Sequence, residues 1–213
     1  LTNIIFLLAF STSILLLKFN LYYRPTAYFI LVAVAAASLA IEVFCTDEKS
    51  RSIPLILLKI IVLSISVRAG IFYEFPTMMG ADAWFHTLLA SNLADTGHMS
   101  SAVKLFFENP NTKYQDFPVF HLMLAVTKLV VNSSMKDAAF FSVGLISVLS
   151  TTFIFLASKY IGGIRLGLMA VLLLNISDML IVRGVTNITP GSLVLCYFML
   201  LLFLIFRPRP GAV

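Results

Sequence analysis

Long apolar runs with few charges divide this chain, and they limit its possible folds more than any other feature. The runs approach the roughly 20 residues with which an α-helix crosses a bilayer. A membrane β-barrel would instead alternate apolar and polar residues, a pattern that the runs lack. With 60% hydrophobic and 12% charged residues, the composition also lies outside the soluble range. We therefore expect an all-α, polytopic helical membrane protein with about six transmembrane helices. The predicted spans are residues 1–17, 27–45, 53–72, 138–158, 166–182 and 191–206.

Residues 73–116 form the one long polar stretch between these runs, and its charges are mostly acidic. A long loop poor in Lys and Arg is expected on the non-cytoplasmic side of the membrane. The basic residues of the chain are scattered, so its net charge of +5 does not indicate nucleic acid as a partner. We expect an integral membrane protein of several passes, with loop 73–116 outside.

Residues 117–131 are apolar but number only about 15, fewer than a bilayer span needs. If they crossed the membrane, the basic clusters at 159–165 and 207–209 would lie on the side of the acidic loop. If they form a juxtamembrane helix that dips in and returns, both clusters become cytoplasmic, as charge bias favours. The polar turn 183–190 then lies outside, beside the loop. This topology leaves two basic residues outside against the bias, Lys18 and Arg24.

Within the outer loop, the spacing of apolar residues predicts a short amphipathic helix over 83–95 on the membrane surface, closed by Gly97. Asp82 and His86 are four residues apart and would share one face of a helix. A carboxylate there can accept the proton of an attacking hydroxyl or amide. It can also help to hold a divalent cation that neutralises a phosphate leaving group. The alternative is that Asp82 is only the N-cap of the helix.

Further candidates lie in the loop and in the outer turn. Trp84 neighbours Asp82 and would hold it at the bilayer surface or contact a substrate. Arg183 is a candidate for binding the donor phosphate, because its planar donors suit phosphate oxygens, or else it is an interfacial anchor. Three other residues are candidate acceptor or substrate contacts: Asp116, His121 and Asn187.

The stretch Asp82-Ala-Trp-Phe-His86, which follows a span and opens a surface helix, resembles the first outer loop of GT-C-type membrane glycosyltransferases. It is most similar to the Asp-x-Trp-aromatic pattern in catalytic subunits of oligosaccharyltransferases, especially archaeal ones. The later order is also similar: a shallow helix, a crossing helix, a basic inner turn with Gly, another helix, and an outer turn that begins with Arg183. Oligosaccharyltransferases place a second acidic pair in that turn, where this chain has Asn187-Ile-Thr-Pro190. Pro190-Gly-Ser-Leu is more similar to the broader family that includes protein O-mannosyltransferases and lipid A aminoarabinose transferases.

The resemblance implies an enzyme that transfers a sugar or oligosaccharide from a polyprenyl phosphate or diphosphate to a protein or lipid acceptor outside the membrane. Asp82 and His86 would be catalytic, and Asp82 would also bind a divalent cation (Mn or Mg). The implied organisation is two additional N-terminal transmembrane helices over 1–52, a GT-C-like module over 53–206, and a cytoplasmic tail or truncation point at 207–213. Its partners would be the lipid-linked donor, membrane lipids and further membrane subunits. The alternatives are a non-catalytic GT-C-like subunit or scaffold, and a transporter of a lipid-linked substrate.

Overall fold

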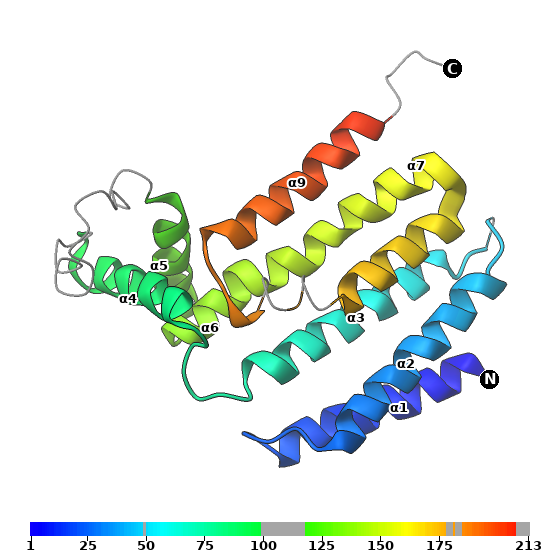
Figure 1. Ribbon diagram of the computed structural model, residues 1–213, viewed down its shortest axis with the longest axis horizontal. Coiled ribbons are helices and arrows are strands. Elements are labelled where there is room, and N and C mark those ends of the chain that lie inside the picture. Colours follow the sequence, from blue (N-terminus) through cyan, green and yellow to red (C-terminus); the bar gives the residue numbers. More distant parts are fainter. Residues whose placement is uncertain (49, 99–117, 178–180, 182–184, 208–213) are drawn as a thin grey trace.

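The computed structural model describes residues 1–48, 50–98, 118–177, 181 and 185–207, and within these ranges the chain is helical with no strand (Figure 1). The prediction of an all-α fold is thereby confirmed. The elements are α1 (Thr2–Phe19), α2 (Thr26–Cys45), α3 (Ile53–Phe72), α4 (Ala81–Thr96), α5 (Val119–Val131), α6 (Met135–Ala139), the π-helical turn η3 (Phe140–Gly144), α7 (Leu145–Ile176) and α9 (Pro190–Phe206).

Four helical stretches of the described residues are long and apolar enough to cross a membrane. They are α1, α2, α3 and the continuous helix Met135–Ile176, while α5 and α9 are shorter apolar helices. The third predicted span coincides with α3, and the first two agree with α1 and α2 to within two residues. The long apolar runs of the sequence therefore predict the positions of these three helices.

The α7 helix reverses direction at a glycine pair, so it consists of two antiparallel arms (Figure 1). Gly163 has φ +84°, a left-handed conformation that L side chains rarely adopt. A little further on, Gly167 lets the arms approach closely, because an added Cβ would lie 2.8 Å from the carbonyl oxygen of Phe155. The predicted break between 158 and 166 is confirmed, and each arm has the length of a separate apolar helix.

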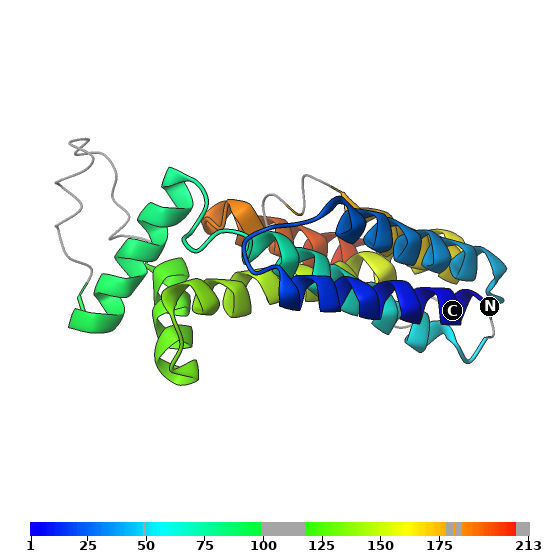
Figure 2. The ribbon, with the colours of Figure 1, turned by 90° about the horizontal axis from the view of Figure 1, so that it is seen from below.

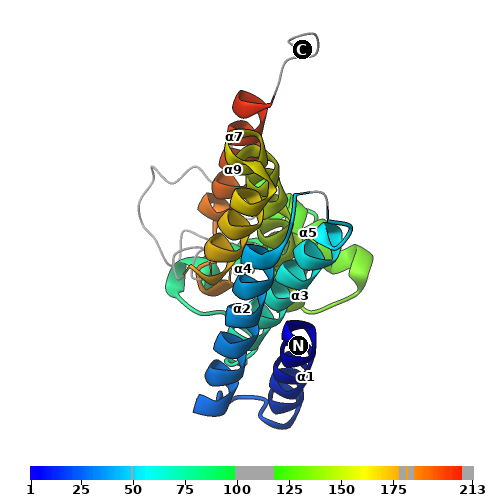
Figure 3. The ribbon, with the colours of Figure 1, turned by 90° about the vertical axis from the view of Figure 1, so that its right-hand side faces the viewer.

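Most of the helices lie roughly along the long axis of the molecule (Figures 1 and 2). They are α1, α2, α3, the two arms of α7 and α9. Seen from one end, they gather side by side into a bundle (Figure 3). The helices α4 and α5 run across this axis at one end, beside the start of α6 (Figure 2). We call this the α4–α5 end. The turn between α1 and α2, the last residues of α3 and the first residues of α9 also lie toward it.

One apolar cluster joins α1, α2, α3 and both arms of α7 in the middle of the bundle, through residues such as Phe6, Leu39, Ile60, Phe155 and Leu168. The outward faces of these helices are rich in exposed Leu, Ile and Phe. A soluble protein rarely exposes this much apolar surface to water. The bundle thus has the surface of a protein that sits among lipid chains, with its core built on helix-to-helix contact.

Buried polar side chains form two clusters in this apolar interior, one around Lys59 and one around Arg68. Near the end opposite α4 and α5, Lys59 of α3 donates to both carboxylate oxygens of Glu42 on α2, at 2.9 Å each, and to Asn3 of α1. Lys59 faces the interior of the bundle, with 8% exposure. Glu42 is the partner that allows it.

Candidate catalytic site

The helix α4 begins at Ala81, two residues earlier than predicted, and ends at Thr96 with Gly97 in the left-handed conformation (φ +74°). Gly80 occupies the N-cap position, and no side chain makes a capping hydrogen bond. The hypothesis that Asp82 is only an N-cap is therefore wrong. Asp82 lies in the first turn, where the helix dipole favours an acid, and its carboxylate remains 65% exposed.

His86 lies one turn after Asp82 and is almost fully buried, at 2% exposure. Its Nε2 lies 3.8 Å from Asp82 Oδ1, which is too far for a hydrogen bond but close enough for an electrostatic contact. On its other side, Nδ1 lies 3.0 Å from Nε2 of His121, a fully buried residue of α5. The structure thus joins Asp82, His86 and His121 in one row that leads from the surface into the interior.

Both imidazoles of this row are neutral at ordinary pH. Burial lowers the pKa of His121 to about 4. Burial also lowers the pKa of His86, although the nearby Asp82 carboxylate opposes the shift. A carboxylate can only accept hydrogen bonds, so the favourable tautomer of His86 carries its proton on Nε2, facing Asp82. In that tautomer, His121 would donate from Nε2 to the bare Nδ1 of His86.

Acidification is expected to loosen the packing of α4 on α5. Because the folded-state pKa of His121 lies below 6.5, the unfolded chain binds protons at higher pH than the folded chain, and stability falls as pH falls from about 6.5 toward 4. Trp84, the single tryptophan, lies on α4, so its fluorescence should change over this range. His121→Phe should reduce the change, since phenylalanine does not titrate and only His86 of the row remains to take up a proton. An unchanged signal in the natural protein down to pH 4 would refute the expectation.

Two further contacts fix α4 against α5. Lys128 of α5 donates to the Asp95 carboxylate of α4 at 2.7 Å, and this hydrogen bond lowers the pKa of Asp95. A second apolar cluster lies beneath the pair and includes Ala90 of α4 and Phe120 of α5 together with Val185 and Ile188. Residues 185–188, before α9, therefore share an apolar cluster with α4 and α5.

The other predicted site residues divide into those that the structure describes and those that it does not. Trp84 is 46% exposed on α4, beside Asp82 in sequence. Asn187 is half-buried in the turn before α9, where its carbonyl oxygen accepts from Ser192 Oγ at 3.2 Å. Asp116 and Arg183 lie outside the described residues.

A divalent cation at Asp82 can be tested against the donors around it. Mg²⁺ and Mn²⁺ favour about six ligands, mostly oxygen. In the ranges that the structure describes, no group of three or more His, Cys, Asp or Glu side chains could hold a metal ion. Asp82 and His86 alone supply only part of such a ligand set, and the chemistry proposed below is written for the residues of the chain.

A second polar cluster, which sequence patterns did not reveal as a unit, lies deeper in the bundle. Arg68 of α3 is fully buried and donates to Ser64 and, at 3.4 Å, to the carbonyl oxygen of Asn175. The Asn175 side chain accepts from Ser64 at 2.7 Å and donates to Thr151 at 3.0 Å. Arg68 thus faces a polar interior, and this cluster joins α3 to both arms of α7.

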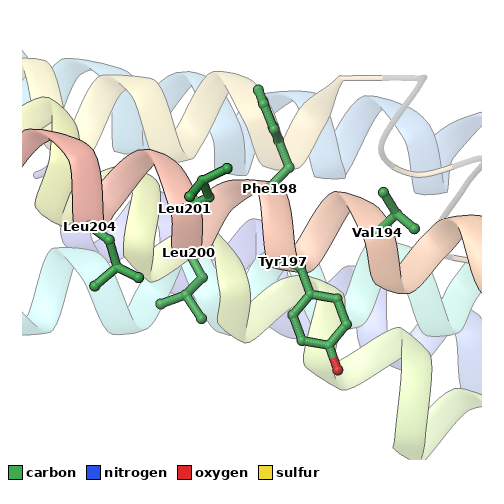
Figure 4. A pocket seen from close by; sticks show the side chains of 6 residues that line it. All are labelled: Val194, Tyr197, Phe198, Leu200, Leu201 and Leu204. Atoms are coloured by element: carbon green, nitrogen blue, oxygen red, sulfur yellow. The ribbon is translucent and has the colours of Figure 1, made fainter. Parts of the chain in front are cut away.

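A pocket of about 460 Å³ follows the exposed side of α9 and is lined by Val194, Tyr197, Phe198, Leu200, Leu201 and Leu204 (Figure 4). All six side chains come from this one helix and project from both of its flanks. No acid, base or nucleophile lines it, apart from the phenol of Tyr197. It has the character of a surface for lipid chains, and the Asp82 row remains the stronger candidate for chemistry.

Comparison with known proteins identifies no relative. No protein-family model, no curated protein and no solved structure matches this chain. What the chain does must therefore be inferred from its own residues and from the likeness of Asp82-Ala-Trp-Phe-His86 to a known first-loop pattern.

Proposed function

We propose that the chain is a GT-C-type membrane glycosyltransferase. It transfers a sugar or oligosaccharide from a polyprenyl phosphate or diphosphate to an acceptor on the non-cytoplasmic face. The observation that most supports this function is the exposed Asp82 carboxylate at the end of an apolar bundle, held beside a buried pair of neutral imidazoles. A carboxylate in this place can meet a polar acceptor from water and a lipid-linked donor from the membrane.

In the proposed reaction, the acceptor oxygen or nitrogen attacks the anomeric carbon of the donor sugar. The new bond forms as the bond from that carbon to the phosphate oxygen breaks, and the electron pair leaves with the polyprenyl phosphate. Asp82 receives the proton that the acceptor loses, which makes it the general base. The charge of the leaving phosphate suits an arginine partner, and Arg183 remains our candidate for that role.

His86 is too deeply buried to meet a substrate directly, so we assign it a positioning role through Asp82. Its Nε2 lies 3.8 Å from the carboxylate and attracts it electrostatically toward this side of α4. Because the imidazole is neutral, it does so without adding a positive charge, which would weaken Asp82 as a base. His121 supports the same tautomer from below. Trp84 and Asn187, at the same end, are candidate contacts for acceptor or donor.

The proposed topology has six crossing helices, namely α1, α2, α3, the two arms of α7 and α9. The α4–α5 end lies on the non-cytoplasmic side and residues 207–213 lie in the cytoplasm. In this topology α5 does not cross, in agreement with its 13 residues and with the charge bias of the connections.

A cysteine in place of Ser133, between α5 and α6, is expected to react with an impermeant maleimide added to intact cells. The experiment uses a background in which Cys45 and Cys196 are replaced by serine and alanine. The matched control is Asp47→Cys, whose position between α2 and α3 is exposed at the opposite end. It should react only after the membrane is permeabilised. The reverse pattern would place the α4–α5 end in the cytoplasm and refute the topology.

A further inference from the structure

Arg24, one of the two basic residues that the charge bias left unexplained, lies in the turn between α1 and α2 and is 92% buried, with 8% exposure. Its Nε donates to the carbonyl oxygen of Gly70 on α3 at 2.6 Å. Its Nη1 donates to three carbonyl oxygens of its own turn, those of Asn20, Leu21 and Tyr23. The guanidinium therefore clamps the turn onto α3.

These partners satisfy hydrogen bonds but leave the charge of Arg24 uncompensated. All four acceptors are backbone carbonyls, and within the described residues no carboxylate lies in ion-pair distance of Arg24. Nη2 makes no hydrogen bond to the described residues. It is also not one of the fully buried nitrogens that lack a partner, so it remains accessible. An unpaired cation in apolar surroundings is costly, so an anion at Nη2 would be strongly favoured.

The space beside this group is a pocket of about 290 Å³. Leu17, Leu21 and Ala69 supply apolar walls, and Tyr22 and Arg24 supply polar groups. Its volume is near the lower limit of pockets that hold small molecules, roughly 300 Å³, and suits a headgroup with the start of its chains. Tyr22 and its neighbour Tyr23 are about two-thirds exposed, as is typical of aromatic residues at the level of lipid headgroups.

From this arrangement we propose that the pocket binds an anionic membrane phospholipid. Its phosphate lies at Nη2 of Arg24, because a guanidinium offers planar donors that match phosphate oxygens. Its acyl chains lie along Leu17 of α1 and Leu21 of the turn that follows it. The site is separate from Asp82 and does not depend on the proposed transfer reaction. In the proposed topology it also accounts for Arg24 on the outer side, since a buried residue that holds a lipid is not a surface charge that orients the chain.

The test uses the full chain, purified in detergent and delipidated, with phosphatidylglycerol or phosphatidylcholine added back. Phosphatidylglycerol should raise the thermal midpoint of the natural protein more than phosphatidylcholine does, and inorganic phosphate should not reproduce the effect. Arg24→Gln should weaken the apparent affinity for phosphatidylglycerol about tenfold, the loss expected for one charge-assisted interaction. The matched control Lys18→Gln removes an exposed charge at the same end and should keep the affinity.

A second variant keeps the test valid if Arg24→Gln fails to fold. Leu21→Trp places a large side chain at a 68% exposed position on the rim, so it should fill the pocket while Arg24 stays in place. It is expected to lower the affinity for phosphatidylglycerol as strongly as Arg24→Gln. Equal stabilisation by the two lipids, stabilisation by inorganic phosphate alone, or full affinity in Leu21→Trp would overturn the proposal.

Discussion

Replacing Asp82 with asparagine is expected to lower the rate of sugar transfer by about 10²–10⁴-fold, the usual contribution of a general base. Asparagine keeps the size of the side chain and its place beside His86 but cannot take up the acceptor proton. Because proton transfer occurs in the transition state, the loss should fall on kcat more than on KM. The measurement is transfer from a polyprenyl-linked sugar in membranes that contain equal amounts of each variant.

The matched control for this variant is Asp95→Asn on the same helix. Asp95 is an exposed acid too, but it is engaged with Lys128 at the far end of α4, so its loss should leave transfer within a few-fold of normal. Asp82→Glu keeps a carboxylate in a shifted position and should retain part of the activity. Equal transfer by Asp82→Asn and the natural protein would remove Asp82 from the reaction.

Replacing Lys59 with methionine is expected to destabilise the bundle by about 3–5 kcal/mol, because it leaves the Glu42 carboxylate without its cation in the apolar interior. Both side chains of the pair are nearly buried, at 10% exposure for Lys59 and 12% for Glu42. The measurement is the free energy of unfolding in detergent micelles, followed by circular dichroism.

A double variant separates the cost of the orphaned charge from the loss of packing. Lys59→Met combined with Glu42→Gln removes both charges, and it should recover most of the stability that Lys59→Met alone loses, since a buried pair is often replaceable by uncharged groups. Lys18→Met, at an exposed position near the end of α1, is the control for removing one lysine and should change stability little. Additive losses in the double variant would show that the two residues act independently.

Much of the fold could be predicted from local sequence, because each predicted element has a local cause. Apolar runs of membrane-spanning length located α1, α2 and α3, and Gly162 and Gly163 marked the reversal within α7. Apolar spacing and Gly97 likewise gave α4 and its end. These features depend on side chains that are close in sequence, and so helical period and glycine conformation are enough to find them.

The pairings between helices could not be predicted in this way. Glu42 and Lys59 lie on different helices, and so do His86 and His121. One signal for His121 was available: it shares the buried face of α5 with Leu124 and Ala125, at a spacing of three and four residues. That spacing predicts burial, but the histidine that it meets depends on how α5 crosses α4. The role of Asp82 as a base likewise remains a prediction from its exposure and its neighbours.

The most direct measurement of the central claim is transfer by the purified chain in liposomes that contain a polyprenyl-linked, radiolabelled sugar and an acceptor mixture of peptides and lipids. The natural protein is predicted to move the label from the carrier to an acceptor, and the Asp82→Asn protein, reconstituted at the same density, is predicted not to. If neither protein moves the label while both remain folded, the chain is not the transferase proposed here, and a non-catalytic membrane subunit becomes the better description.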